Sequence, residues 1–359
     1  MCGQFVELCR RLKLFTRAVV AIDGSKFKAV NNRDKNYTVA KVAGRMEQVD
    51  ASIARYLRAL DRADREESDI AEAKSVRLKE KIAGLRQQMQ ALKVMEQTVQ
   101  DAPDQQVSLT DPDARSMATS GKGTETVGYN VQIAVDAEHH LIVAHEVINQ
   151  GYDRHQLALM AFKAQQATGN KEITALADRG YFTGDQVLSC ESTGVAPIVP
   201  KTLTSSGTKR GFFTRQDFIY DAEHDHYTCP AGAKLTKATR RADHTEDLDF
   251  YRHLSACFTC SLRPRCTPTK LRRIKRWVNE DVLDRMQDRL DRMPEAMGVR
   301  RQTVEHPFGT LKAWMGATHF LTRTLDKVRT EMSLHVLAYN IKRMITILDV
   351  GPLMAAIRT

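Results

Sequence analysis

Three carboxylates stand at positions from which they could bind metal ions together. Asp23 ends the apolar run AVVAIDG, Asp178 follows the apolar run EITALA, and Glu305 lies in the helix-like stretch RQTVEHPFGTLK. Clustered carboxylates repel one another unless a cation joins them. Mg²⁺ and Mn²⁺ prefer oxygen ligands and keep positions open for water and phosphate. The three acids therefore predict phosphoryl transfer at a site that holds two such ions.

Each acid also fits a role without chemistry. An Asp that follows a strand is often a helix N-cap or a turn residue. Glu305 follows Arg301 by four residues, which fits a surface ion pair on a helix. Asp136 and Asp153 also follow strand-like runs, so the order of elements alone does not choose Asp178.

The elements around these acids describe one mixed α/β core. AVVAIDG predicts a first strand, and the segments GYNVQIAVD and HLIVAHEVI predict a β-hairpin. HQLALMAFKAQQA and GDQVLSCES predict helices, whereas EITALADRG and VAPIVPK predict strands. The order β, ββ, α, β, α, β is typical of an α/β fold with a mixed sheet flanked by helices.

Two insertions interrupt this core. Between 46 and 96, two apolar seams with spacings of three and four residues flank a polar break, which predicts an antiparallel helical hairpin. The hairpin fits a spacer or an interaction arm. A loop is expected over 101–123, and an irregular stretch over 202–279. The predicted parts are a first strand with its lead-in (1–44), the hairpin (45–100), the main core (101–201), a Cys-rich basic insertion (202–279) and C-terminal helices that carry Glu305 (280–359).

The Cys-rich insertion contains a Cys-x2-Cys pair with two further cysteines. This donor set suits a structural, tetrahedral Zn²⁺, and free cysteines in a loop are the alternative. The four candidate ligands are Cys229, Cys257, Cys260 and Cys266.

A basic block overlaps this insertion. Between Arg252 and Arg276 there are eight Lys or Arg residues and no acid. The segment RRIKRW is a candidate contact to phosphates, with Trp277 available for stacking on a base, and a solvated basic loop is the alternative. Its candidate contacts are Arg272, Arg273, Lys275 and Arg276.

Composition adds weaker constraints. The 359 residues carry a formal net charge of +10, which suits a polyanionic partner but is shared by many soluble proteins. No apolar run is long enough to cross a bilayer, and the N-terminal MCGQFVELCRRLKLF has no secretion-type apolar core. A cytoplasmic protein without a membrane partner is expected.

Several motifs, in their order, resemble the insertion-sequence DDE transposases, whose catalytic domain has a ribonuclease-H-like fold. They are AIDGSKFKA, DPDARSM, GYNVQIAVD, ALADRGYF, YTCPAG with CFTCSLRPRC, and the run from RRQTVEHPFGTLK to NIKRM. Related transposases carry Tyr-x2-Arg-x3-Glu-x6-Lys around the catalytic Glu. Arg301, Glu305 and Lys312 keep that spacing, and Gly298 stands at the Tyr position.

The resemblance implies a function for each acid. Asp23 and Asp178 are the catalytic aspartates, Glu305 is the catalytic glutamate, and Mg²⁺ or Mn²⁺ is the cofactor. Arg301 and Lys312 are expected to contact DNA phosphates. Pro307 implies a first-turn position or a kink beside Glu305.

The expected reaction is metal-dependent cleavage at transposon ends, followed by strand transfer into target DNA by a homo-oligomeric assembly. The family usually carries a helical domain ahead of the first Asp, whereas 22 residues precede Asp23 here. Two alternatives follow: a catalytically silent DNA-binding remnant that inhibits a full-length transposase, and a ribonuclease-H-like nuclease that cuts without strand transfer.

Overall fold

The computed structural model describes residues 2–15, 17–65, 69–118, 125–202, 211–238 and 248–358. They form two compact units. One comprises Met1–Arg17, Ile22–Asp153 and Gln302–Thr359, and the other comprises Ala18–Ala21 and Arg154–Arg301. For convenience these are called the first unit and the second unit.

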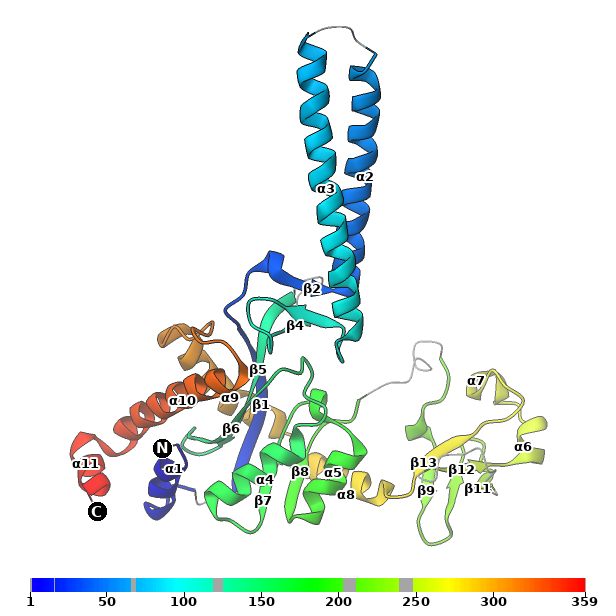
Figure 1. The fold of residues 1–359 in the computed structure, drawn as a ribbon. Coiled ribbons are helices and arrows are strands. Elements are labelled where there is room, and N and C mark those ends of the chain that lie inside the picture. The colour runs from blue at the N-terminus through cyan, green and yellow to red at the C-terminus, as the bar shows by residue number, and fades with distance from the viewer. Residues whose placement is uncertain are drawn as a thin grey trace. The chain divides into compact units, whose positions relative to one another are not determined.

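Strand β1 (Val19–Lys28), drawn in blue in Figure 1, takes part in both units by its residue numbers. In the second unit its first residues pair in parallel with β7 (Ile173–Leu176), from Val19 opposite Thr174 to Ala21 opposite Leu176. Strand β7 in turn pairs in parallel with β8 (Val195–Ile198).

In the first unit, the later part of β1 neighbours β5 (Glu125–Asp136). Strand β5 pairs antiparallel with β4 (Arg115–Ala118) and with β6 (Ile142–Ile148). The strand order β4-β5-β1-β7-β8, with β6 also on β5, is a mixed sheet. Together with its helices it confirms the predicted ribonuclease-H-like α/β fold class.

Helices stabilise each part of this sheet. In the second unit, Leu176 and Ile198 pack against Ala296, which begins α9. In the first unit, Asn340 of α10 reaches the edge of β6, where its amide accepts from the Ile142 N–H and donates to the Ile142 carbonyl, both at 2.9 Å. The helices of the two units are α1 (Cys2–Arg11), α4 (Leu157–Thr168), α5 (Gly184–Ser192), α8 (Glu280–Arg292), α9 (Ala296–Gly309), α10 (Leu325–Leu348) and α11 (Val350–Arg358).

The predicted helical hairpin is confirmed as an insertion after the first strand. It consists of α2 (Val39–Ala63) and α3 (Asp69–Asp101), which run side by side in Figure 1. The first helix begins earlier than the predicted seam, because the Thr38 hydroxyl caps it by accepting from the Lys41 N–H. Strands β2 (Asn36–Thr38) and β3 (Gln106–Ser108) pair at its base. Residues 66–68 of the polar break lie outside the described residues.

The predicted loop over 101–123 was partly wrong, because it contains β3 and β4. The motif DPDARSM leads into β4 and contains the buried Asp111. The Asp111 carboxylate accepts the Tyr129 hydroxyl at 2.9 Å and the Thr324 N–H at 3.0 Å, just ahead of α10. These long-range bonds order a segment whose composition is typical of turns. Residues 119–124 lie outside the described part.

The stretch from 202 to 279 was predicted as irregular, and this prediction was wrong. Its described residues form a five-stranded sheet in the order β13-β12-β11-β10-β9. A small core of Phe218, Tyr227, Leu235, Tyr251 and Ile274 packs on this sheet. Residues 203–210 and 239–247 lie outside the description. The elements are β9 (Ile219–Asp221), β10 (His226–Thr228), β11 (Lys234–Lys237), β12 (Leu248–Arg252), α6 (Leu254–Phe258), α7 (Arg263–Cys266) and β13 (Ile274–Trp277).

Across the described ranges, none of the helices has the length and the apolar character required of a membrane span.

Candidate active site

Asp23 lies inside β1 and does not end it, so that detail of the sequence prediction was wrong. The strand continues to Lys28, and the Ala29 N–H donates to the Val127 carbonyl at 3.0 Å. The polar residues after Asp23 interrupt the apolar run without ending the strand, because β5 provides backbone partners there. Asp23 is half-buried, and its Oδ1 atom accepts the Gly24 N–H at 2.9 Å.

Gly24 follows Asp23 where polar side chains approach the backbone closely. A Cβ atom at this position would lie 2.2 Å from Gln132 Nε2 and 2.6 Å from Asp153 Oδ1. Both distances are too short for a contact, so any larger residue here would displace the ends of these two side chains. Asp153 Oδ1 itself accepts from Asn130 Nδ2 at 2.8 Å and Gln132 Nε2 at 2.6 Å.

Asp153 is thus a carboxylate held beside the residue that follows Asp23. Its place depends on amides from β5, which is distant in sequence. The sequence marked Asp153 only as one of several acids that follow strand-like runs.

Glu305 lies on α9 and is exposed, whereas the adjacent Thr303 and Val304 are each about 1% exposed. Pro307 lies inside the helix and not in its first turn. Because proline has no N–H, it cannot donate to the Thr303 carbonyl. The Nδ1 atom of His140 lies 3.4 Å from that carbonyl. This contact supplies a polar neighbour where the helical hydrogen bond is absent.

Helix α9 passes into a π-helical turn, η5 (Thr310–Trp314), which carries Lys312. The Nζ atom of Lys312 donates to Ser25 Oγ at 2.7 Å and to the Lys26 carbonyl at 3.0 Å. Burial lowers the pKa of Lys312, and the charge of Asp23 opposes that shift. Lys312 therefore joins the segment that follows Glu305 to the strand that carries Asp23, within the first unit.

Asp178 lies two residues after the end of β7 in the second unit and caps the short helix η2 (Arg179–Tyr181). Its Oδ1 atom accepts the Gly180 N–H at 2.7 Å, and its Oδ2 atom lies 3.4 Å from Arg300 Nη2. The N-cap role considered from the sequence is therefore present. The N-cap hydrogen bond uses the Oδ1 atom of Asp178, whereas its Oδ2 atom faces the guanidinium of Arg300.

The four candidate zinc ligands lie around one pocket in the Cys-rich part. Cys229, Cys257, Cys260 and Cys266 line it, together with His253. Burial raises the pKa of Cys266, Arg272 opposes this rise, and the other three cysteines add to it. Four thiolates suit Zn²⁺, but the sulfur atoms of these described cysteines do not form a group within 4.8 Å of one another.

Some side chains of the basic segment pack against their neighbours, and others are exposed. The guanidinium of Arg276 is 11% exposed, stacks 3.7 Å from the centre of the Tyr220 ring and donates to Asp284 at 3.0 Å. Arg272 donates to the Cys266 carbonyl at 3.1 Å. Arg273 and Lys275 are exposed, as is Arg301 on α9. These three side chains are accessible to a polyanion.

The strand order and the helices define a ribonuclease-H-like protein with carboxylates on β1, two residues after β7 and on α9. The profile of a protein family described as the transposase DDE domain matches residues 93–341. This match covers more than half of the chain, so the protein belongs to the transposase DDE domain family. Asp178 and Glu305 lie within the matched residues, whereas Asp23 lies before the first matched residue.

No curated protein matches the chain. Among solved structures, the chain is similar to a piggyBac transposase in a synaptic complex with hairpin DNA, with 8% identity and a TM-score of 0.21. The alignment covers 68% of this chain and 52% of the piggyBac chain, so this protein spans about half the length of that transposase.

Proposed function

We propose that this protein is a DDE-type DNA transposase that cleaves DNA at transposon ends and transfers the freed ends into target DNA. Membership of the transposase DDE domain family over residues 93–341 supports this class of reaction.

The observation that carries the proposal is the register of β1 and β7. Ala21 pairs with Leu176 in a parallel ladder. Asp23 follows Ala21 by two residues, and Asp178 follows Leu176 by two residues in the same direction. Equal steps along paired parallel strands keep two positions at the same level of the pair. The register therefore supports a shared site for the two aspartates.

The proposed metal ligands are Asp23, Asp178 and Glu305, because a set of carboxylate oxygens suits Mg²⁺ or Mn²⁺. When bound, such ions would supply positive charge that stabilises the attacking and leaving oxygens of phosphoryl transfer. The exposure of Glu305 and the partial exposure of Asp23 and Asp178 agree with that role.

The reaction has two phosphoryl transfers. In the first, water attacks the phosphorus at a transposon end, the bond to the 3′ oxygen breaks, and a 3′-OH and a 5′-phosphate result. In the second, this 3′-OH attacks a target phosphodiester and displaces another 3′ oxygen. The contribution of the chain is to orient the DNA and to balance its charge.

Two parts of the chain are proposed to hold the DNA. Lys312, held at Ser25, lends positive charge beside Asp23. Arg301, Arg273 and Lys275 are exposed and are proposed to contact phosphates. The cysteine pocket is proposed to bind a structural Zn²⁺ that holds the basic segment in place.

The active form is proposed to be a homo-oligomer. The helical hairpin exposes Val76 and Val94, which are 52% and 61% exposed, along α3. Apolar side chains on an extended helical pair are suited to contact a second copy.

The test is incubation of the protein with labelled DNA that carries the transposon ends, Mn²⁺ and a target plasmid. Products joined to the plasmid are expected. Cleavage without joined products would support a nuclease without strand transfer. Binding without cleavage would support a catalytically silent remnant.

A further inference from the structure

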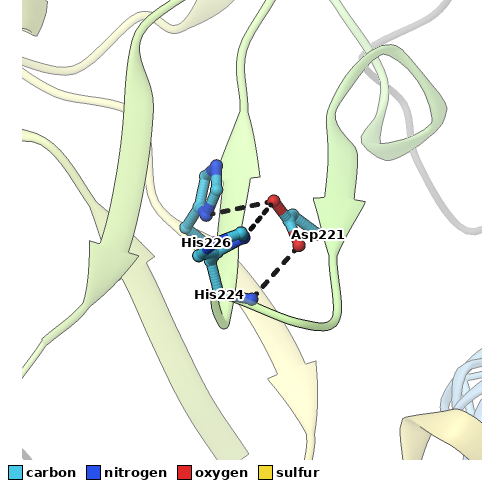
Figure 2. Close-up of side chains that lie close together, drawn as sticks. All are labelled: Asp221, His224 and His226. Atoms are coloured by element: carbon cyan, nitrogen blue, oxygen red, sulfur yellow. Dashed lines mark hydrogen bonds and ion pairs between the residues drawn. The ribbon is translucent and has the colours of Figure 1, made fainter.

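A second group of metal-ligating side chains lies on the β9–β10 hairpin, apart from the three acids and the four cysteines. Asp221 ends β9 and pairs in register with His226, which begins β10. His224 lies in the turn between them. One ligand atom from each residue lies within 4.8 Å of the other two (Figure 2).

The turn uses only one oxygen of Asp221. Its Oδ1 atom accepts the N–H groups of Glu223 at 3.0 Å and His224 at 3.1 Å. Asp225, with a φ of 47°, completes the reversal of the chain. The turn geometry is therefore explained without the second oxygen.

The second oxygen, Oδ2, faces both imidazoles. It lies 3.0 Å from Nδ1 of His224 and 3.7 Å from Nδ1 of His226. Figure 2 shows both rings on the same side of the carboxylate. The formation of the hairpin thus brings two nitrogens to one carboxylate oxygen.

These spacings are close to those of a zinc site. Bonds of about 2.0 to 2.1 Å at tetrahedral angles place neighbouring donor atoms about 3.3 Å apart. The two observed spacings lie on either side of that value. Imidazole nitrogens with one carboxylate suit Zn²⁺, whereas Mg²⁺ and Ca²⁺ prefer oxygen donors alone.

Burial gives the three ligands different roles. The side chain of His226 is 6% exposed, that of Asp221 is 36% exposed and that of His224 is 65% exposed. A buried imidazole is a fixed ligand, and the exposed side of the group admits water.

We propose that Asp221, His224 and His226 bind one Zn²⁺ ion and leave its fourth position open to water or to an outside ligand. Such an ion would cross-link β9 and β10 at their turn. This inference does not depend on the proposed transposase activity, since it concerns metal binding alone.

The test uses the full chain, freed of metal with a chelator under reducing conditions and titrated with Zn²⁺ and, separately, Co²⁺. Asp221→Asn keeps an oxygen for the turn, and His224→Ala changes an exposed side chain. Each is expected to weaken zinc binding at this site by more than about tenfold. The matched control Glu223→Gln, in the same turn, is expected to bind zinc as the native chain does.

Two readouts separate this site from the cysteine pocket. Cobalt bound by thiolates gives a sulfur-to-metal charge-transfer band, which both variants should keep. In the native chain, Zn²⁺ is expected to shift the NMR signals of the His224 and His226 rings. Equal zinc binding by the native chain and both variants, or ring signals that do not respond to zinc, would overturn the proposal.

Discussion

Lys312 donates a hydrogen bond to the hydroxyl of Ser25 at 2.7 Å, across 287 positions of the sequence. Its ammonium group also lies 4.6 Å from the centre of the Phe27 ring. One side chain on the π-helical turn thus contacts three consecutive residues of β1, because it also reaches the Lys26 carbonyl. In the first unit, this cation links the end of the α9 region to the strand of Asp23.

The first prediction concerns this link. Lys312→Ala removes a charged donor, together with its two hydrogen bonds and its cation–π contact. The free energy of unfolding is expected to fall by about 1 to 3 kcal/mol. Urea unfolding followed by circular dichroism measures the change. Lys327→Ala, on an exposed face of α10, is the control and should change stability by less than about 0.5 kcal/mol. Equal stability of the two variants would show that Lys312 is only a surface cation.

A second prediction concerns DNA contacts by the basic segment. Arg273→Ala combined with Lys275→Ala removes two exposed cations. The slope of log affinity for DNA against log salt concentration is expected to become shallower by about 2. Fluorescence anisotropy with one duplex at several salt concentrations measures this slope. An unchanged slope would place the DNA contacts elsewhere.

Arg276 provides the matched comparison in the same basic segment. Because its guanidinium stacks on Tyr220 and bonds Asp284, Arg276→Ala is expected to lower stability by about 1 to 3 kcal/mol. Its effect on the salt slope should be smaller than that of the double variant.

A third prediction concerns pH. Burial acts to raise the pKa of Glu331, but bonds from the Thr322 hydroxyl and from the N–H groups of Leu321 and Thr322 outweigh it, and the pKa lies below the ordinary 4.5. Between the folded pKa and 4.5 the unfolded chain binds more protons, so the free energy of unfolding rises with pH in that window. The contribution is complete above 4.5 and is lost as pH falls through the folded pKa.

Glu331→Gln should therefore cost about 1 to 3 kcal/mol at pH 7, and less at pH 4, below the ordinary pKa of 4.5. Urea unfolding of the variant and the native chain at both pH values measures the difference. A cost that is the same at both pH values would show that the charge of Glu331 contributes nothing.

A fourth prediction concerns the cysteine pocket. Cys257→Ser is expected to remove the thiolate charge-transfer band of the cobalt-loaded protein and about one equivalent of zinc. Cys190→Ser is the control, because Cys190 is buried on α5 outside the pocket. Loss of the same amount of zinc from both variants would contradict a site made by the four clustered cysteines.

The sequence predicted the main sheet well where strands have an apolar or alternating pattern of their own. Strands β5, β6, β7 and β8 are of this kind. The sheet of the Cys-rich part escaped prediction because its strands have three to five residues and lack the apolar runs that mark the equally short β7 and β8. Their order comes from distant pairs, such as Leu248 with Trp277.

The same physical reason limits what the sequence revealed of the site. The types and spacing of Asp23, Asp178 and Glu305 indicated metal chemistry, whereas Asp153 is brought beside Gly24 only by side chains of β5. The zinc ligands proposed on the β9–β10 hairpin come together because the two strands pair. The sequence carries no metal-binding motif, such as Cys-x2-Cys, that would indicate them.

The central claim is that Asp178 acts with Asp23 and Glu305 on DNA. Its most direct test is Mn²⁺-dependent cleavage of labelled transposon-end DNA by Asp178→Asn, compared with Asp185→Asn. Asp185 is an exposed acid in the first turn of α5 in the same unit. The account predicts that Asp178→Asn abolishes cleavage while DNA binding persists, and that Asp185→Asn cleaves as the native chain does. Undiminished cleavage by Asp178→Asn would contradict it.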